Sequence, residues 1–61
     1  MINIGDVFYD VDNDREIVVT NIDKWSKSAC CDVLDYDCYE VVQKTYSQNF
    51  TFTELNHFDK R

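Results

Sequence analysis

The 61-residue sequence has no proline, a single glycine, no repeat and no low-complexity stretch. Linkers between domains are usually rich in proline, glycine and small polar residues. No boundary is therefore visible at which the chain could be divided, and we expect one domain over residues 1–61. A domain of this size buries only about 60% of the surface that its unfolded chain exposes, so we expect modest stability.

The sequence also lacks a long apolar run and a positively charged start, since it opens with MINIGDVFYD. A signal peptide or a membrane-spanning helix needs such an apolar run. We therefore expect an intracellular, cytoplasmic protein. The three cysteines agree with this expectation, because small secreted domains that rely on disulfides normally carry an even number.

Basic residues are scarce, with six Lys and Arg against twelve Asp and Glu and a net charge of −6. The field around such a molecule repels phosphate backbones, so we expect no direct binding to nucleic acid or to an anionic membrane. Residues 1–40 carry ten acids and three bases, whereas residues 41–61 carry two acids and three bases. The acidity therefore belongs to the first two thirds of the chain.

Short segments rich in β-branched and aromatic residues predict an all-β fold. Strands are expected over residues 6–11, 16–22, 29–34, 38–47 and 49–53, of which 16–22 should be the central and most buried. Turns are expected at residues 12–14, 23–28 and 35–37. Thr53 should N-cap one C-terminal helical turn in which Leu55 meets Phe58. Five short strands with short connections predict a small antiparallel meander or a barrel.

Three stretches of the chain follow the pattern of a known family: IGDVFYD, REIVVTNID and FTFTELNHF. The last of them is interpreted as a strand running into a helical turn. In this pattern the chain resembles the small SH3-like barrels of the Tudor and KOW type over most of its length. The resemblance implies a binding module, because such barrels seldom hold catalytic sites. It also implies an aromatic cage for methylated lysine as one use of the aromatic side chains. The aromatic residues concerned are Phe8, Tyr9, Tyr39, Tyr46, Phe50, Phe52 and Phe58. We expect most of them to form the core instead of a cage.

Carboxylates at alternate positions in DVDNDREIVVTN, residues 10–21, have the spacing of a calcium-binding EF-hand loop. Asp10, Asp12 and Asp14 fit ligand positions 1, 3 and 5 of that loop. Arg15, however, stands where the sharp turn needs glycine, and Asn21 stands where the bidentate glutamate belongs. We therefore favour a solvated hairpin tip over a specific calcium site.

A zinc ion in a structural site takes four ligands. Cys30, Cys31, Cys38 and His57 could supply them. Adjacent residues on a strand point to opposite faces, so Cys30 and Cys31 cannot easily converge on a metal. We expect reduced thiols that pack as small apolar groups, and we leave open a Cys31–Cys38 disulfide. No motif places a nucleophile beside a base in a cleft. We therefore expect no enzymatic activity and no cofactor, and a calcium- or zinc-binding domain is the second alternative function.

Two aromatic residues lie in polar surroundings. Trp25, in DKWSKS, is either an exposed interface anchor or a lid that folds back over one end of the core, and we favour the lid. Tyr36 lies between Asp35 and Asp37 in an expected turn, so it should be exposed and is the better candidate for an aromatic contact. The first alternative function is accordingly a peptide-binding module that uses Trp25, Tyr36 and Tyr39.

The turns of an antiparallel meander alternate between the two ends of the sheet, so the first and third turns should share one end. Strands lie about 4.8 Å apart, which puts the two hairpin tips on the order of 10 Å apart. This separation is within the range of duplex groove dimensions. The expected partner-contacting residues are Asp10, Asp12, Asp14, Glu16, Asp32, Asp35, Tyr36, Asp37 and Glu40, together with Trp25.

This arrangement predicts a non-enzymatic, acidic protein-binding module that mimics the charge of nucleic acid and occupies a basic surface of a nucleic-acid-handling protein. The competing interpretation is an acidic face that only serves solubility. Small acidic domains of this kind resemble accessory proteins of bacteriophages and mobile elements, some of which block nucleic-acid-handling enzymes of the host, which would place the protein in the host cytoplasm. An exposed edge strand can pair two copies, so the oligomeric state stays open.

Overall fold

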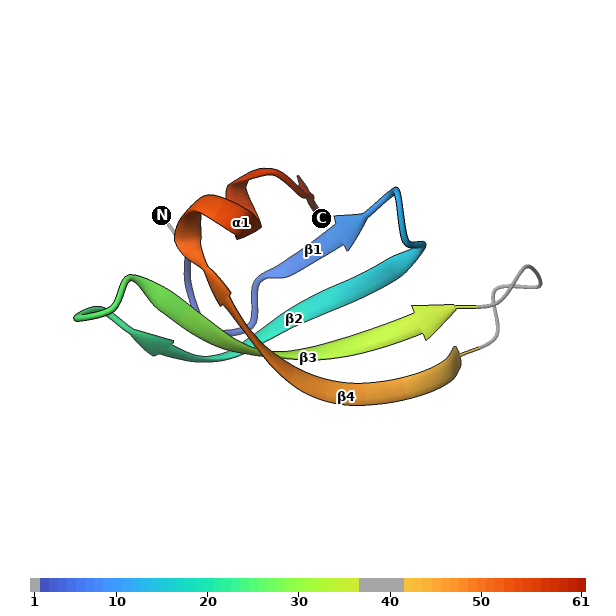
Figure 1. Ribbon diagram of the computed structural model, residues 1–61, viewed down its shortest axis with the longest axis horizontal. Helices are drawn as coiled ribbons and strands as arrows, with labels where there is room; N and C mark the ends of the chain where they lie inside the picture. The colour runs from blue at the N-terminus through green and yellow to red at the C-terminus, as the bar shows by residue number, and fades with distance from the viewer. Residues whose placement is uncertain (1, 37–41) are drawn as a thin grey trace.

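The computed structural model describes the backbone of residues 2–36 and 42–61, and the side chains of residues 2–36 and 45–61. Five strands form one antiparallel sheet in the order β4-β3-β2-β1-β5, and one short helix lies against it (Figure 1). The elements are β1 (Val7–Asp10), β2 (Arg15–Asp23), β3 (Ser28–Tyr36), β4 (Val42–Thr51), α1 (Phe52–Asn56) and β5 (Asp59–Lys60). The prediction of a mostly β, five-stranded antiparallel fold is confirmed.

The first three predicted strands and the position of β2 are confirmed. β2 is the central strand of the sheet, with β1 on one side and β3 on the other. Ile17 and Val19 on β2 are fully buried, because β-branched side chains at alternate positions of a central strand face the core. The register between β2 and β3 shifts between Val19 and Asn21, and such a bulge increases the bend of a sheet.

The fourth strand and the third turn differ from the prediction. Asp35 and Tyr36 are the last two residues of β3 and do not form a turn. β4 is one continuous strand from Val42 to Thr51, whereas a break after residue 47 was predicted. Residues 28–34 of β3 hold a regular register against residues 45–51 of β4, and this pairing carries the strand past Ser47 without a break. The position expected for Asp37 lies outside the described residues.

The predicted fifth strand at residues 49–53 is also wrong. Residues up to Thr51 belong to β4, and Phe52 is the first residue of α1. The N-cap is Thr51 and not Thr53, because the Thr51 side chain accepts the Glu54 N–H while the Glu54 carboxylate accepts the Thr51 N–H. This reciprocal pair is a capping box. The fifth strand is instead the two-residue β5, which pairs with Phe8 and Tyr9 of β1.

The core lies on the inner face of the curved sheet, beneath α1 and the segment that leads to β5 (Figure 1). Its ring contact joins Phe50 and Phe58 edge to face, with centroids 5.8 Å apart. No pairing in the described chain joins β4 to β5, so the sheet is an open meander and not a closed barrel. The buried apolar side chains are Phe8, Ile17, Val19, Ala29, Cys31, Val33, Phe50 and Leu55.

Candidate functional site

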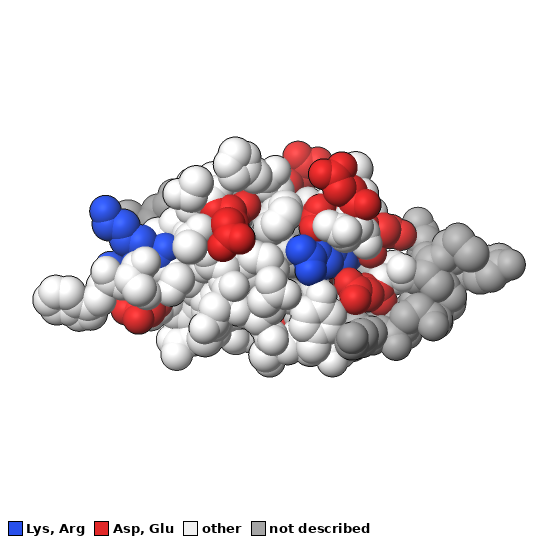
Figure 2. All heavy atoms as spheres, viewed as in Figure 1, with Lys and Arg blue, Asp and Glu red and all other residues white. Residues whose placement is uncertain are grey.

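Two acidic segments of the chain meet at one end of the sheet. Arg15, the first residue of β2, is in register with Asp35 near the end of β3. The Tyr36 N–H donates to the carbonyl of Asp14 over 3.1 Å, which ties the end of β3 to the first turn. Most acidic side chains on the visible face gather toward the β1–β2 turn (Figure 2). We call this end, with Asp12, Asp14, Glu16, Asp35 and Tyr36, the acidic end.

The acidic end includes one sharply constrained residue. Asp14 has a φ of 49°, in the left-handed region, and it closes the four-residue connection between β1 and β2. Aspartate tolerates this conformation better than most residues because its short side chain can bond nearby groups. The Tyr9 hydroxyl donates to the Asp14 carboxylate. Asp14 is therefore positioned by the fold.

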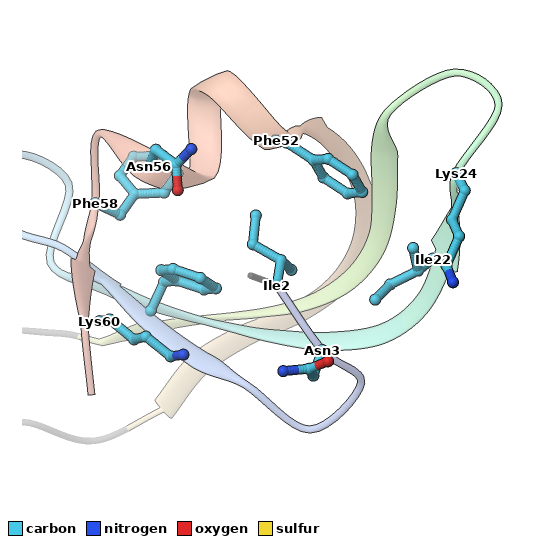
Figure 3. Close-up of a pocket in the computed structure, with 9 residues that line it drawn as sticks. Ile2, Asn3, Ile22, Lys24, Phe52, Asn56, Phe58 and Lys60 are labelled. Atoms are coloured by element: carbon cyan, nitrogen blue, oxygen red, sulfur yellow. The ribbon is translucent and has the colours of Figure 1, made fainter.

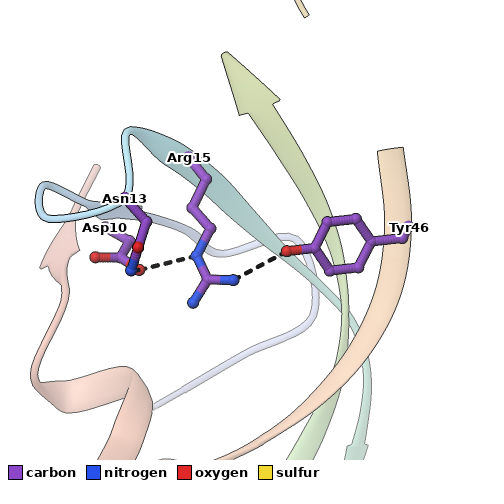
Figure 4. Close-up of polar contacts among 4 residues, drawn as sticks. All are labelled: Asp10, Asn13, Arg15 and Tyr46. Carbon is purple, nitrogen blue, oxygen red and sulfur yellow. Dashed lines mark hydrogen bonds and ion pairs between the residues drawn. The ribbon is translucent and has the colours of Figure 1, made fainter. Parts of the chain in front are cut away.

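Asp10 is an acidic residue that the fold uses internally. The residue is 4% exposed, and its Oδ2 accepts from Arg15 Nε at 2.8 Å and from Asn13 Nδ2 at 2.8 Å (Figure 4). Arg15 Nη1 also donates to the Tyr46 hydroxyl at 3.0 Å, and the guanidinium lies 5.6 Å from the centroid of the Phe50 ring. This network covers the inner face at the acidic end.

The pKa values of this pair reflect burial opposed by hydrogen bonding. Burial by itself raises the pKa of Asp10, but the hydrogen bonds from Asn13 and Arg15 outweigh it, so the pKa lies below its ordinary value. Burial by itself lowers the pKa of Arg15. The hydrogen bonds to Asp10 and Tyr46 outweigh the effect of burial, so the pKa of Arg15 lies above its ordinary value. Asp10, which sequence reasoning placed among the partner contacts, is thus held in a charged internal pair.

The outer face of the sheet carries a mixed surface. Side chains that alternate with the buried residues point outward, and across β1, β2 and β3 this places Tyr9, Glu16 and Leu34 in one row. Val18 and Asp32 are opposite each other in the next row. All five are half-buried, and Asp32 accepts a hydrogen bond from Ser47 Oγ at 3.3 Å. Carboxylates and apolar groups therefore share this face.

A hollow of about 300 Å³ lies at the acidic end, lined by Tyr9, Asp14, Glu16, Tyr36 and Arg61. The Arg61 guanidinium lies 4.3 Å from the centroid of the Tyr9 ring, and the Arg61 N–H donates to the Val7 carbonyl over 2.7 Å. Desolvation, followed by the charge and hydrogen bond of Glu16, raises the pKa of Tyr36. Tyr36 therefore keeps its phenolic proton at neutral pH and remains a hydrogen-bond donor.

A second, larger hollow of about 610 Å³ was not anticipated from the sequence. Phe8, Ile2, Ile22, Phe52 and Phe58 give it apolar walls. Asn3, Lys24, Asn56 and Lys60 also line it, and the side chains of Ile2, Phe52 and Phe58 gather below α1 (Figure 3). Sequence reasoning put Phe52 on a strand, so it missed that α1 turns this ring toward the hollow.

The prediction that Trp25 folds back over the core is wrong. Its side chain is 98% exposed, in the turn between β2 and β3. The Asp23 carboxylate accepts the N–H of Trp25 at 3.0 Å, which fixes a short turn directed away from the core. This turn is at the opposite end of the sheet from the acidic end (Figure 1), so Trp25 and Tyr36 do not share one contact site.

The cysteines follow the expected alternation on β3. Cys31 is fully buried and Cys30 is exposed, where its Sγ donates to Asn49 Oδ1 at 2.9 Å. Burial, with smaller effects from Cys30 and Asp32, raises the pKa of Cys31 to about 11. Among the described residues, no three His, Cys, Asp or Glu side chains are grouped so that they could hold a metal ion. Cys38, Tyr39 and Glu40 lie outside the described residues.

Comparisons of this chain with protein-family models, with curated proteins and with solved structures found no match. In the part of the chain that the structure describes, no helix has the length and apolar character needed to cross a membrane.

Proposed function

We propose that this domain is a non-enzymatic protein-binding module whose acidic end and adjoining outer face engage a basic surface on a nucleic-acid-handling protein. The observation that carries the proposal is the placement of Asp12, Glu16 and Asp32. Asp12 lies in the connection between β1 and β2, Glu16 on β2 and Asp32 on the neighbouring β3. None of the three forms an ion pair with a described side chain. Arg15, the nearest base along the chain, is bound to Asp10.

An array of uncompensated carboxylates attracts a basic partner over a long range and raises the rate of association. Two features support mimicry of nucleic-acid charge over a purely solubilising face. The carboxylates are concentrated at one end, and apolar groups such as Val18 and Leu34 lie among them on the outer face. A surface that serves only solubility has no need of interspersed apolar contact area.

β5 returns to β1 after a short helix, an order that resembles the SH3-like barrels of the Tudor and KOW type, although here the sheet stays open. We infer that the chain is a binding module of that general kind, of the type found among phage and mobile-element accessory proteins. Its place of action would be the cytoplasm, or the host cytoplasm where a phage encodes it.

The experiment compares two double variants of equal net charge. Asp12→Asn with Asp32→Asn removes two carboxylates from the proposed surface, and Ser26→Lys with Asn56→Lys adds two positive charges elsewhere. Both changes raise the net charge by two. Binding of a fluorescent nine-residue arginine peptide is measured at low and moderate salt, with duplex DNA as a competitor for the peptide.

The proposal expects the double asparagine variant to bind the peptide about tenfold more weakly than wild type, and the double lysine variant to lose markedly less. Affinity should fall steeply with added salt. Equal losses in the two variants would mean that only net charge matters, and would overturn the proposal. So would binding that does not change with salt.

A second candidate function, recognition of an apolar peptide, is favoured by the hollow beneath α1, where Ile2, Phe52 and Phe58 present apolar surface. Amide chemical-shift mapping with a library of apolar peptides separates the two functions. Peptide recognition predicts shifts at residues 52–58. The acidic module predicts shifts at residues 12–16 and 32–36 when the arginine peptide is added.

A further inference from the structure

The hollow at the acidic end has an unusual set of walls for an exposed surface. Two phenol rings, Tyr9 and Tyr36, and two carboxylates, Asp14 and Glu16, line it together with the side chain of Arg61. The register explains the grouping. Tyr9 is opposite Glu16 across β1 and β2, and the backbone bond from Tyr36 to Asp14 brings the third strand alongside.

Arg61 shows which chemistry this hollow accepts. Its guanidinium lies 4.3 Å from the centroid of the Tyr9 ring, a distance typical of a cation over an aromatic face. A guanidinium is planar and weakly hydrated, so it stacks on rings and bonds to carboxylates at the same time, which an ammonium group does less well. The pocket therefore holds a guanidinium from the same chain.

The contact between Arg61 and the hollow is incomplete. Within the described chain, no ion pair joins Arg61 to Asp14 or to Glu16. The Arg61 side chain is exposed, and its backbone is held separately by the bond from its N–H to Val7. Its side chain can therefore leave Tyr9 without unpairing β5. Asp14 and Glu16 accept hydrogen bonds from Tyr9 and Tyr36, and their carboxylates have lone pairs left for a better-placed guanidinium.

We propose that this hollow is the receptor for an arginine side chain of the basic partner, and that Arg61 occupies it in the free protein as an internal competitor. Binding then exchanges one guanidinium for another on the Tyr9 ring, and the incoming one adds charge-assisted hydrogen bonds to Glu16 and Asp14. This inference rests on the proposed function, because it names a contact within the same interface. It adds a preference for arginine over lysine, which net charge alone does not produce.

The test uses peptides of nine arginines and of nine lysines, which have equal charge, with four single variants. Arg61→Gln removes the internal competitor. Lys60→Gln is the control for charge, since the neighbouring residue is also exposed and the change in net charge is the same. It removes the Asp6–Lys60 ion pair, which lies outside the hollow. Glu16→Gln and Tyr36→Ala alter the walls of the hollow. Thermal unfolding of each variant confirms that it is folded. If Tyr36→Ala does not fold, Glu16→Gln alone tests the walls of the hollow.

We expect both Arg61→Gln and Lys60→Gln to raise the affinity for the arginine peptide. The affinity of Arg61→Gln should be about three times that of Lys60→Gln. Glu16→Gln and Tyr36→Ala should weaken binding of the arginine peptide more than that of the lysine peptide. In wild type, the Arg61 Nε–H signal in a ¹H–¹⁵N spectrum should carry a ring-current shift. That shift should collapse when the arginine peptide is added, because Arg61 leaves the Tyr9 ring.

Equal effects of Arg61→Gln and Lys60→Gln, together with equal losses for the two peptides in Glu16→Gln, would overturn this inference and leave the proposed function standing. An Arg61 signal that keeps its shift at saturating arginine peptide would overturn it as well. Failure of both peptides to bind wild type at low salt would instead overturn the proposed function, and this inference with it.

Discussion

Arg15 Nε lies 2.8 Å from Asp10 Oδ2, and the two side chains are only 16% and 5% exposed. The pair covers the core at the acidic end, with Tyr46 and Phe50 against the guanidinium. Two acids only two residues apart, Asp10 and Asp12, thus have different roles: one is internal and paired, and the other is exposed.

Asp10→Ala is expected to lower the free energy of unfolding by about 3 kcal/mol, because it leaves the half-buried Arg15 guanidinium without its carboxylate. This is a large part of the stability of a domain of this size. Asp12→Ala, the exposed control, should change it by less than about 0.5 kcal/mol. Urea denaturation followed by circular dichroism measures both. If Asp10→Ala does not fold, Asp10→Asn gives the comparison, and equal stabilities would contradict the structural role of Asp10.

Stability is expected to fall in acid. The pKa of Asp10 is lower in the folded protein than its ordinary value, as is that of Asp6, which accepts the Asn3 N–H. A carboxyl group with a depressed folded pKa stabilises the protein fully above its unfolded pKa of about 3.9, and this contribution is lost as the pH falls through the folded pKa. The free energy of unfolding should therefore be level between about pH 5 and pH 7 and decline below about pH 4. Urea titrations in Asp10→Asn should show a shallower decline, and an identical profile would contradict the assignment.

Thr51→Ala is expected to destabilise the protein by about 1 kcal/mol, because it removes half of the capping box at the start of α1. Thr53→Ala is a matched control two residues away. Thr53 lies inside the helix and is exposed, so alanine should be neutral or slightly stabilising there. Thermal unfolding ranks the two variants, and a greater loss in Thr53→Ala would restore the cap expected from the sequence.

Trp25, the single tryptophan, makes the exposure of the β2–β3 turn measurable. Its fluorescence in the folded protein should resemble that of tryptophan in water and be readily quenched by acrylamide. Unfolding in urea should shift the emission very little, and Trp25→Phe should alter stability by less than about 0.5 kcal/mol. A blue-shifted emission that moves to the red on unfolding would instead show a buried ring.

Strands were predicted correctly where the local sequence pattern is strong. They were predicted wrongly where pairing with a strand distant in the sequence sets the ends of the strand. The run of β-branched residues from Ile17 to Thr20 marks β2 without any knowledge of its neighbours. The span of β4 depends on its pairing with β3, and β5 has only two residues, too few for a pattern, so its place depends on β1. The cap moved from Thr53 to Thr51 for the same reason, since the end of β4 determines where α1 begins.

The sequence by itself determined the class of the fold, the approximate spans of the first three strands and the central place of β2. These follow from runs of β-branched and aromatic residues, which are properties of the chain alone. Only the tertiary structure decided that Asp10 is paired with Arg15, that Trp25 faces solvent and that Arg61 reaches Tyr9. Each of these depends on register, and a shift of one residue between strands moves a side chain to the opposite face of the sheet.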